Sequence, residues 1–203
     1  FRGTLNVDQV LDDVIPAFEK LKDAGKTRFL GFTAKGDADD LHKLVKCGAF
    51  SSAQVFYNLL VPSAGEAVPA NYPADDFRQL LNVALDNGVG SIGVRVLAGG
   101  ALSGSEARHP LGMASVDPIG SETDYATDVR RARQFIPLVE AGHAASLPEL
   151  AIRYVISNPA LSTTEIGIAT LEELQQAAAA VNKGPLSDDA LAQIKKVQAG
   201  FAV

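Results

Sequence analysis

The sequence predicts an α/β fold built around a parallel sheet. Helical apolar patterns alternate with short apolar strand candidates, giving an opening helix and then four strand–helix units. This alternation is typical of parallel strands joined by right-handed crossovers. Hydrophobic residues make up 47% of the 203 residues and charged residues 21%, as in a globular domain. Four units are too few to close an eight-stranded barrel, so the pattern leaves an open doubly wound sheet and half of a barrel as alternatives.

The first helix is predicted over residues 7–21, where apolar residues recur at helical spacing. Pro16 lies inside this pattern and predicts a kink or a break, because proline has no backbone N–H. Gly25 then predicts the end of the helical segment. Residues 27–33 are short and apolar and predict the first strand.

The next units follow the same pattern. Asp37 can cap a helix that Gly48 closes, and residues 53–57 then predict the second strand. Residues 62–73 contain several prolines and predict a loop. A helical apolar face over residues 77–85 completes the unit.

The third strand is predicted over residues 91–97 and runs into a glycine-rich segment, 98–104. The backbone N–H groups of such a segment can hold a phosphate, although a tight turn is the simpler interpretation. A long polar loop follows over 105–123, and helical patterns then cover 124–141 and 147–157.

The fourth strand is predicted over residues 163–168. Thr170 and Glu173 have the spacing of a capping box at the start of the next helix. A last helix is predicted over 187–199. Because no linker interrupts the alternation, residues 1–203 are predicted to form a single domain.

Composition argues against several classes of function. The 18 Lys and Arg residues are outnumbered by 24 Asp and Glu residues, so a nucleic-acid partner is not expected. No run approaches the roughly 20 apolar residues of a membrane span. Cys47 is the single cysteine, which excludes an internal disulfide and fits a cytoplasmic protein. His42, His109 and His143 are each isolated from a second ligand, so no metal site is expected.

Arg95 is the most informative charged residue, because it lies near the end of an otherwise apolar strand. A buried charge is costly unless it is paired. Its partner is either a carboxylate inside the fold or an anionic ligand at the strand ends, where parallel α/β folds bind ligands. Gln54 and Tyr57 lie three residues apart on one strand and should therefore point to opposite faces.

Four segments of the chain resemble the aldo/keto reductase family, in the family's order and across nearly the whole sequence. They are residues 25–33 (GKTRFLGFT), 54–60 (QVFYNLL), 90–100 (GSIGVRVLAGG) and 164–174 (TEIGIATLEEL). The family folds as a (β/α)8 TIM barrel and transfers hydride between a nicotinamide cofactor, NAD(P), and a carbonyl or alcohol. The resemblance implies that this chain supplies strands five to eight of such a barrel, with their helices.

The resemblance implies a cofactor site but no catalytic residue in this chain. The family's catalytic Asp, Tyr, Lys and His lie on the first four strands, and Tyr57 belongs to a different strand. Thr33 and Gln54 match the residues that hold the nicotinamide carboxamide. Arg95 and the backbone of the two residues after it match the pyrophosphate site. The cofactor-binding residues implied are Thr33, Gln54, Arg95, Val96, Leu97, Gly167, Ile168, Ala169, Thr170 and Glu173.

Several positions depart from the family pattern and bear on the choice of cofactor. Gly167 and Glu173 stand where NADP-preferring members often carry Lys and Arg for the 2′-phosphate. Ala34, Val94 and Ala177 also replace residues that often contact the cofactor. Glu173 would repel a 2′-phosphate and could accept hydrogen bonds from ribose hydroxyls. We therefore expect NAD or a relaxed preference rather than strict NADP use.

The first hypothesis for function is an NAD(P)-dependent oxidoreductase that acts on a small aldehyde, ketone, sugar or alcohol. Its catalytic tetrad would lie outside this chain, so the 203 residues alone would be inactive. One alternative is a non-catalytic half-barrel that serves as a cofactor-binding or protein-interaction subunit. Another is an unrelated α/β protein that matches by chance.

Half a barrel would leave two strand edges and an apolar inner face uncovered. A missing N-terminal half or a second copy is therefore the expected partner. The chain begins with Phe1 and its single methionine is Met113, so residue 1 is not expected to be an ordinary translation start.

Overall fold

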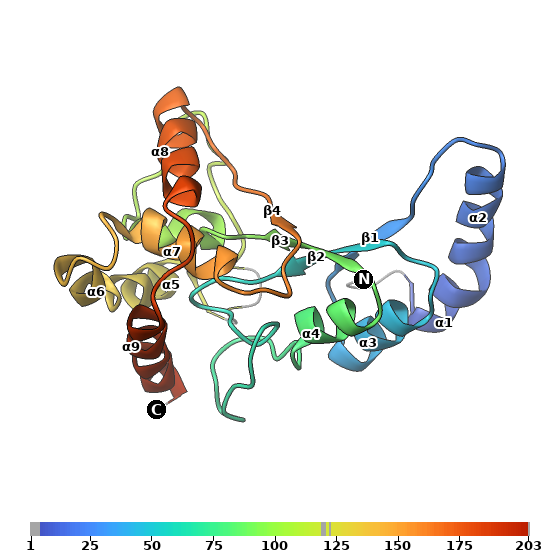
Figure 1. The fold of residues 1–203 in the computed structure, drawn as a ribbon, viewed down its shortest axis with the longest axis horizontal. Coiled ribbons are helices and arrows are strands. Elements are labelled where there is room, and N and C mark those ends of the chain that lie inside the picture. Colours follow the sequence, from blue (N-terminus) through green and yellow to red (C-terminus); the bar gives the residue numbers. More distant parts are fainter. Residues whose placement is uncertain (1–4, 119–120, 122, 203) are drawn as a thin grey trace.

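A computed structural model describes residues 5–118, 121 and 123–202. These residues form a four-stranded parallel sheet with helices packed against it (Figure 1). The strands are β1 (Gly31–Ala34), β2 (Ser52–Phe56), β3 (Gly90–Val94) and β4 (Thr163–Thr164), and they are neighbours in chain order. All three strand pairs are parallel, which confirms the predicted α/β class.

Helices precede, connect and follow the strands as the alternation predicts. The α-helices are α1 (Val7–Gln9), α2 (Ile15–Asp23), α3 (Ala38–Lys46), α4 (Leu80–Asp86), α5 (Tyr125–Arg133), α6 (Ile136–Glu140), α7 (Leu147–Ile156), α8 (Leu171–Asn182) and α9 (Asp188–Ala199). A π-helical turn, η1 (Val10–Val14), and two 3-10 segments, η2 (Ala98–Ser103) and η3 (Gly200–Ala202), complete the order.

The first predicted helix is interrupted beside Pro16, as expected. The chain passes from α1 through the π-helical turn η1 into α2, and Pro16 lies in the first turn of α2. Proline is tolerated there because the first N–H groups of a helix have no partner within it. The wider turn just before Pro16 relieves the clash that a regular helix would place on the proline ring.

Three strands are shorter than the sequence predicts. The strand predicted over 91–97 ends at Val94, because Arg95 adopts a left-handed conformation with φ of 60°. The strand predicted over 163–168 comprises Thr163–Thr164 alone. The strand predicted over 27–33 begins only at Gly31, where its pairing with β2 starts.

Two helix boundaries also differ from the prediction. The helix predicted over 77–85 begins at Leu80, because the two residues before it have positive φ values of 48° and 59°. The pattern over 124–141 is divided into α5 and α6. Pro137 lies in the first turn of α6 and cannot donate the hydrogen bond that would continue α5.

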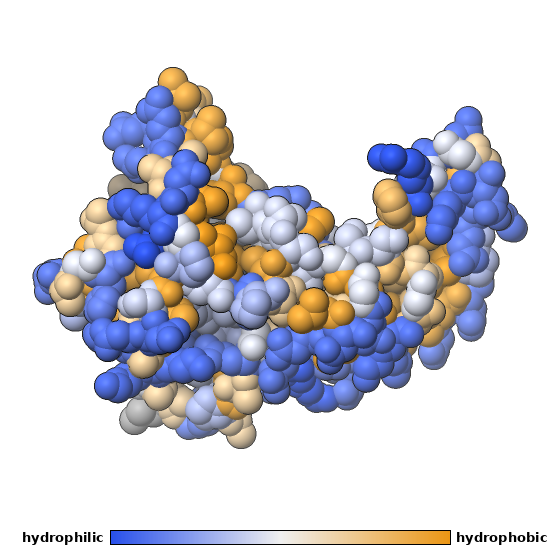
Figure 2. Space-filling view, viewed as in Figure 1, coloured by the Kyte–Doolittle hydropathy of each residue, from blue (hydrophilic) through white to orange (hydrophobic). Residues whose placement is uncertain are grey.

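The sheet has one covered face and one open face. Successive strand residues point to opposite faces. Most of the covered positions are fully buried, including Ala34, Ala53, Val55 and Ser91. Apart from Phe56 at the end of β2, the open positions stay half-buried or exposed and include Thr33, Gln54, Ile92 and Thr163. Figure 2 shows the molecule hollowed between the end that carries α8 and the end that carries α2.

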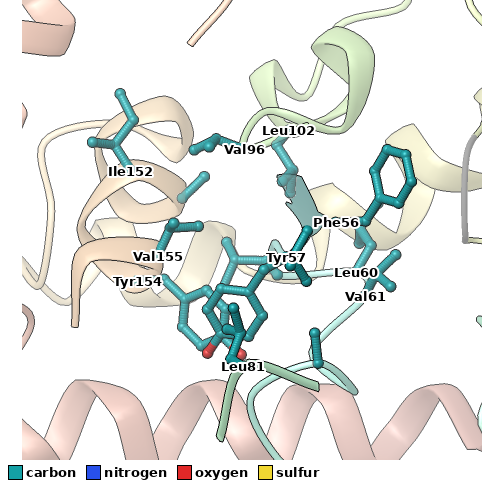
Figure 3. Close-up of a cluster of buried hydrophobic side chains, with 14 of the residues drawn as sticks. Phe56, Tyr57, Leu60, Val61, Leu81, Val96, Leu102, Ile152, Tyr154 and Val155 are labelled. Atoms are coloured by element: carbon teal, nitrogen blue, oxygen red, sulfur yellow. The ribbon is translucent and has the colours of Figure 1, made fainter. Parts of the chain in front are cut away.

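The main core lies on the covered side of the sheet and includes residues of α4, α5, α7 and α9. Figure 3 shows part of it, with Val96 and Leu102 packed near α7. Tyr57 is 4% exposed and stacks on Tyr154 of α7 with ring centroids 5.2 Å apart. Tyr57 therefore faces the core while Gln54 lies on the open face, as the strand alternation predicts.

A second, smaller core joins α1, η1 and α2 to α3. Its buried members are Val7, Val10, Ile15, Leu30, Leu44 and Phe50. The rings of Phe32 and Phe50 pack with centroids 4.9 Å apart, which links this cluster to β1. The opening helical segment is thus held against the edge of the sheet by apolar burial.

Candidate functional site

Three polar side chains form a hydrogen-bonded row across the open face of the sheet. Thr33 Oγ1 donates to Gln54 Oε1 over 2.9 Å. Gln54 Nε2 lies 3.3 and 3.5 Å from the two carboxylate oxygens of Glu165 and donates to them. We call Thr33, Gln54 and Glu165 the polar row.

The register of the sheet brings the polar row together. Thr33 of β1 lies directly opposite Gln54 of β2, so their side chains share one face. Gln54 in turn lies opposite Ile92, and Ile92 opposite Thr163. Glu165 is two residues beyond Thr163 and its N–H continues the ladder to Gly93 O at 2.8 Å, which keeps its side chain on the same face.

Sequence reasoning did not single out Glu165. The signal was present, because Glu165 is a charge inside an apolar strand candidate, as Arg95 is. Its contact with Gln54 joins residues 111 positions apart, and strand register is needed to see it. The structure thus places Glu165 in contact with one of the predicted site residues.

Arg95 follows β3 directly and has a half-buried side chain. Its backbone carbonyl accepts from Asn58 Nδ2 at 2.9 Å and from the Ala98 N–H at 2.7 Å, which stabilises the left-handed turn. Within residues 5–118, 121 and 123–202, no side chain forms an ion pair or hydrogen bond with the Arg95 guanidinium. Two partners were predicted for Arg95, an internal carboxylate or an anionic ligand. The described residues do not supply the internal carboxylate.

The glycine-rich segment after Arg95 forms tight turns, in line with the simpler of the two interpretations. Gly100 N donates to Leu97 O at 2.8 Å and Gly104 N to Ala101 O at 3.0 Å. A Cβ at Gly99, which has φ of 66°, would stand 3.3 Å from Arg95 Nη1 and 2.6 Å from Val116 Cγ1. Glycine is required there both by its backbone conformation and by these close neighbours.

The polar loop after this segment folds back onto it through Arg108. The Arg108 guanidinium donates to Gly99 O at 3.0 Å and to Met113 O at 2.6 Å, and lies 5.2 Å from the ring centroid of Tyr125. Of the loop predicted over 105–123, residues 119, 120 and 122 lie outside the described residues. The described part of the loop is therefore held beside Gly99.

The far end of this loop is held by a buried carboxylate. Asp128 of α5 is 1% exposed and accepts from Ser121 Oγ and Thr123 Oγ1, each at 2.8 Å. Burial raises the pKa of Asp128 above its ordinary value, and the two hydroxyl bonds oppose this effect only in part. The buried Asp128 carboxyl group thus anchors the end of the polar loop to α5.

The capping box predicted at the start of α8 is present. Thr170 Oγ1 accepts from the Glu173 N–H at 3.1 Å. Glu173 Oε2 accepts from the N–H groups of Ala169 at 2.5 Å and Thr170 at 3.3 Å. The positive end of the helix dipole is thus occupied by a carboxylate of the chain itself.

The predicted cofactor residues fall toward the carboxyl ends of four adjacent parallel strands. Thr33 lies in β1, Gln54 in β2, Arg95 directly after β3 and residues 167–170 after β4. Ligands of parallel α/β folds bind at this end of the sheet. Val96 is 1% exposed and belongs to the core.

Each of the three histidines lies within hydrogen-bond distance of another group of the protein. His42 Nε2 lies 3.1 Å from Phe77 O, and His143 Nε2 lies 3.1 Å from Gln193 Nε2. His109 Nδ1 accepts from a backbone N–H two residues further along. Among the described residues, no three His, Cys, Asp or Glu side chains gather as a metal site would require. Within the residues that the structure describes, no helix is long and apolar enough to cross a bilayer.

Comparisons with known proteins give one consistent result. A family model described as "Aldo/keto reductase family" matches residues 5–199. The curated L-galactose dehydrogenase of Arabidopsis thaliana is 24% identical over 184 residues, which cover 88% of this chain and 49% of that protein.

Two solved structures share the fold. An aldo-keto reductase from Bacillus halodurans in its holo form matches with a TM-score of 0.65 and 20% identity, over 96% of this chain and 58% of its own. An aldo/keto reductase from Klebsiella pneumoniae, solved in complex with NADP and acetate, matches with a TM-score of 0.63 and 20% identity, over 98% and 56%. The chain spans 49% of the curated relative and 56–58% of these structures.

Proposed function

We propose, because this chain belongs to the aldo/keto reductase family, that it forms the cofactor-binding part of an NAD(P)-dependent oxidoreductase. The reaction is hydride transfer between nicotinamide and a small carbonyl compound or alcohol. The curated relative is named for a sugar, which supports a sugar within this substrate class. We take the four strands as counterparts of strands five to eight of the family's barrel, an assignment supported by their order and by the share of the relatives that the chain covers.

The observation that carries this proposal is the pairing of Thr33 with Gln54 on the open face. A hydroxyl and a side-chain amide, joined over 2.9 Å, offer the donors and acceptors that a carboxamide needs. These are the two residues that the resemblance matches to the nicotinamide carboxamide. Their positions in neighbouring strands fix the hydroxyl and the amide relative to each other.

Arg95 fits the phosphate end of the same cofactor. Its guanidinium has no partner among the side chains that the structure describes, and Arg binds phosphate oxygens through a planar set of donors. The close approach of Arg95 Nη1 to Gly99 places this charge beside the glycine turn. An anionic ligand would supply the counter-charge that the described chain does not.

The capping box of α8 supports a preference for NAD or a relaxed preference. The Glu173 carboxylate binds the N–H groups of Ala169 and Thr170, two predicted cofactor residues. A 2′-phosphate approaching these N–H groups would meet a negative charge. Ribose hydroxyls can instead donate to that carboxylate.

The cofactor, when bound, supplies a hydride at nicotinamide C4. The residues of this chain bind and orient it: Thr33 and Gln54 hold the carboxamide and Arg95 holds the phosphates. The resemblance places the acid that protonates the carbonyl oxygen outside these 203 residues. We therefore expect the chain to bind cofactor and to show no turnover by itself.

The partner predicted from the sequence, an N-terminal half or a second copy, would cover the sheet edges. Among the described strands, β1 and β4 each have a neighbour on one side alone. Leu171 and Leu174 of α8 are 69% and 48% exposed, and Phe18 and Leu21 of α2 are 41% and 48% exposed. Exposed apolar stripes at both ends of an open sheet favour a covering partner.

Calorimetric titration of the purified chain with NADH tests the proposed site. We expect Gln54→Leu to weaken binding about fivefold, as for one lost hydrogen bond, and Arg95→Met to weaken it about thirtyfold, as for a lost charge-assisted bond. Gln134→Leu and Arg130→Met make the same chemical changes at exposed positions of α5 and should bind like the parent chain. Unchanged affinity in both site variants would refute the assignment.

A further inference from the structure

Glu165 directly follows β4 and carries the one charge of the polar row. The half-buried or exposed strand positions on this face are uncharged: Gly31, Thr33, Ser52, Gln54, Gly90, Ile92, Val94 and Thr163. Glu165 is held by a neutral group, the Gln54 amide, at 3.3 and 3.5 Å. The polar row therefore ends in a negative charge.

That carboxylate has no counter-ion within the described chain. None of the Lys, Arg or His side chains of residues 5–118, 121 and 123–202 forms an ion pair with it. An uncompensated carboxylate is tolerated on an open face but becomes costly when a ligand or a second layer encloses the face. A cation in the site would remove that cost.

We propose that Glu165 makes the site bind the oxidised, positively charged nicotinamide in preference to the reduced, neutral one. The inference rests on the proposed function, because Thr33 and Gln54 locate the nicotinamide on the polar row. The two redox forms have almost the same shape and differ by one positive charge on the ring. A nearby fixed negative charge is therefore able to distinguish them.

This preference would bias the reaction at the site. Tighter binding of the oxidised form favours the state in which the hydride has left nicotinamide C4 and formed a bond to the carbonyl carbon. The carbonyl oxygen then takes the proton from the acid outside this chain. Glu165 would act as a positioning residue for Gln54 and as a determinant of the redox state that the site prefers.

The test compares affinities for NAD⁺ and NADH by calorimetry in the parent chain and in Glu165→Gln. We expect the ratio of the dissociation constants, oxidised over reduced, to rise about fivefold, the size expected for one charge just beyond hydrogen-bond contact in a partly hydrated site. Glu165→Asp keeps the charge while shortening the side chain, and should keep most of the parent ratio. Glu140→Gln removes a charge from an exposed position of α6 and should leave the ratio unchanged.

The outcomes separate this inference from the proposed function. If the parent chain binds both forms and Glu165→Gln changes the ratio less than twofold, the inference fails and the cofactor site stands. If Glu165→Gln weakens both forms equally, Glu165 only positions Gln54 and the charge effect is refuted. If the parent chain binds neither form, both proposals are overturned.

Discussion

Glu173 occupies the start of α8 in a way that should set the choice between NADH and NADPH. Its carboxylate binds the Ala169 and Thr170 N–H groups while Thr170 Oγ1 binds the Glu173 N–H. Replacing Glu173 by Gln preserves the capping box, since Gln is its common alternative at this position. The variant therefore removes the charge and keeps the local structure.

The size of the effect follows from the charges involved. Two unit charges about 4 Å apart in water interact by about 1 kcal/mol, and a phosphate monoester carries nearly two charges at neutral pH. Loss of the Glu173 charge should therefore favour NADPH by about 2 kcal/mol before salt screening, and by about tenfold in affinity after it. NADH has no 2′-phosphate, so its affinity should change less than threefold.

Calorimetric titration with NADPH and NADH measures both affinities in Glu173→Gln, and thermal unfolding shows that the cap is kept. Glu172→Gln is the matched control, because Glu172 lies in the same turn but binds the Gln176 side chain at 3.1 Å. Glu173→Ala should bind NADPH better as well, while losing about 1 kcal/mol of stability with its cap. The reasoning is refuted if Glu173→Gln gains no more for NADPH than Glu172→Gln does.

Three further predictions concern the loop and the polar row. Folding raises the pKa of Asp128, so the protonated carboxyl stabilises the folded state at low pH. This stabilisation is lost as the pH rises from 3.8, the ordinary pKa of the group, through the pKa in the folded state. The free energy of unfolding, measured in urea, should therefore fall across this pH range in the parent chain and not in Asp128→Asn. Gly99→Ala, forced into a left-handed conformation against Val116, should destabilise the chain by more than about 1 kcal/mol in the same assay. Gln54→Glu should weaken NADH binding more than tenfold, because it places two carboxylates together and removes the Nε2 donor. Adding Glu165→Gln should relieve the repulsion and leave a loss of about fivefold, as in Gln54→Leu; a double variant as weak as Gln54→Glu would contradict the hydrogen-bonded row.

Local patterns predicted the parts of the fold that depend on neighbouring residues. Asp37 accepts from the N–H groups of Asp39 and Asp40 at the start of α3, as its sequence position suggests. Pro16 interrupts the first helical segment where its missing N–H requires it. Such features are set within one turn of helix, so the sequence shows them directly.

Features that depend on distant contacts were not predictable in this way. β3 ends at Val94 because Arg95 turns left-handed, with its carbonyl held by Asn58 from 37 positions away. The apolar pattern continues to Leu97, so periodicity alone does not show that the strand ends earlier. Glu165 was missed for the same reason, because its partner Gln54 lies two strands away in the sheet.

The polar row also determines how Gln54 presents its amide. An ionised Glu165 can only accept, so the atom facing it must be Nε2; Oε1 then faces the Thr33 hydroxyl, which donates to it. A ligand on the open face is left with the second Nε2 hydrogen and the remaining lone pair of Oε1. Without the carboxylate, Thr33 could donate to Oε1 or accept from Nε2, and the amide would lose its fixed orientation. One charge directly after β4 thus fixes the hydrogen-bonding pattern that Gln54 offers on the open face, and in the proposed site that pattern would meet a carboxamide.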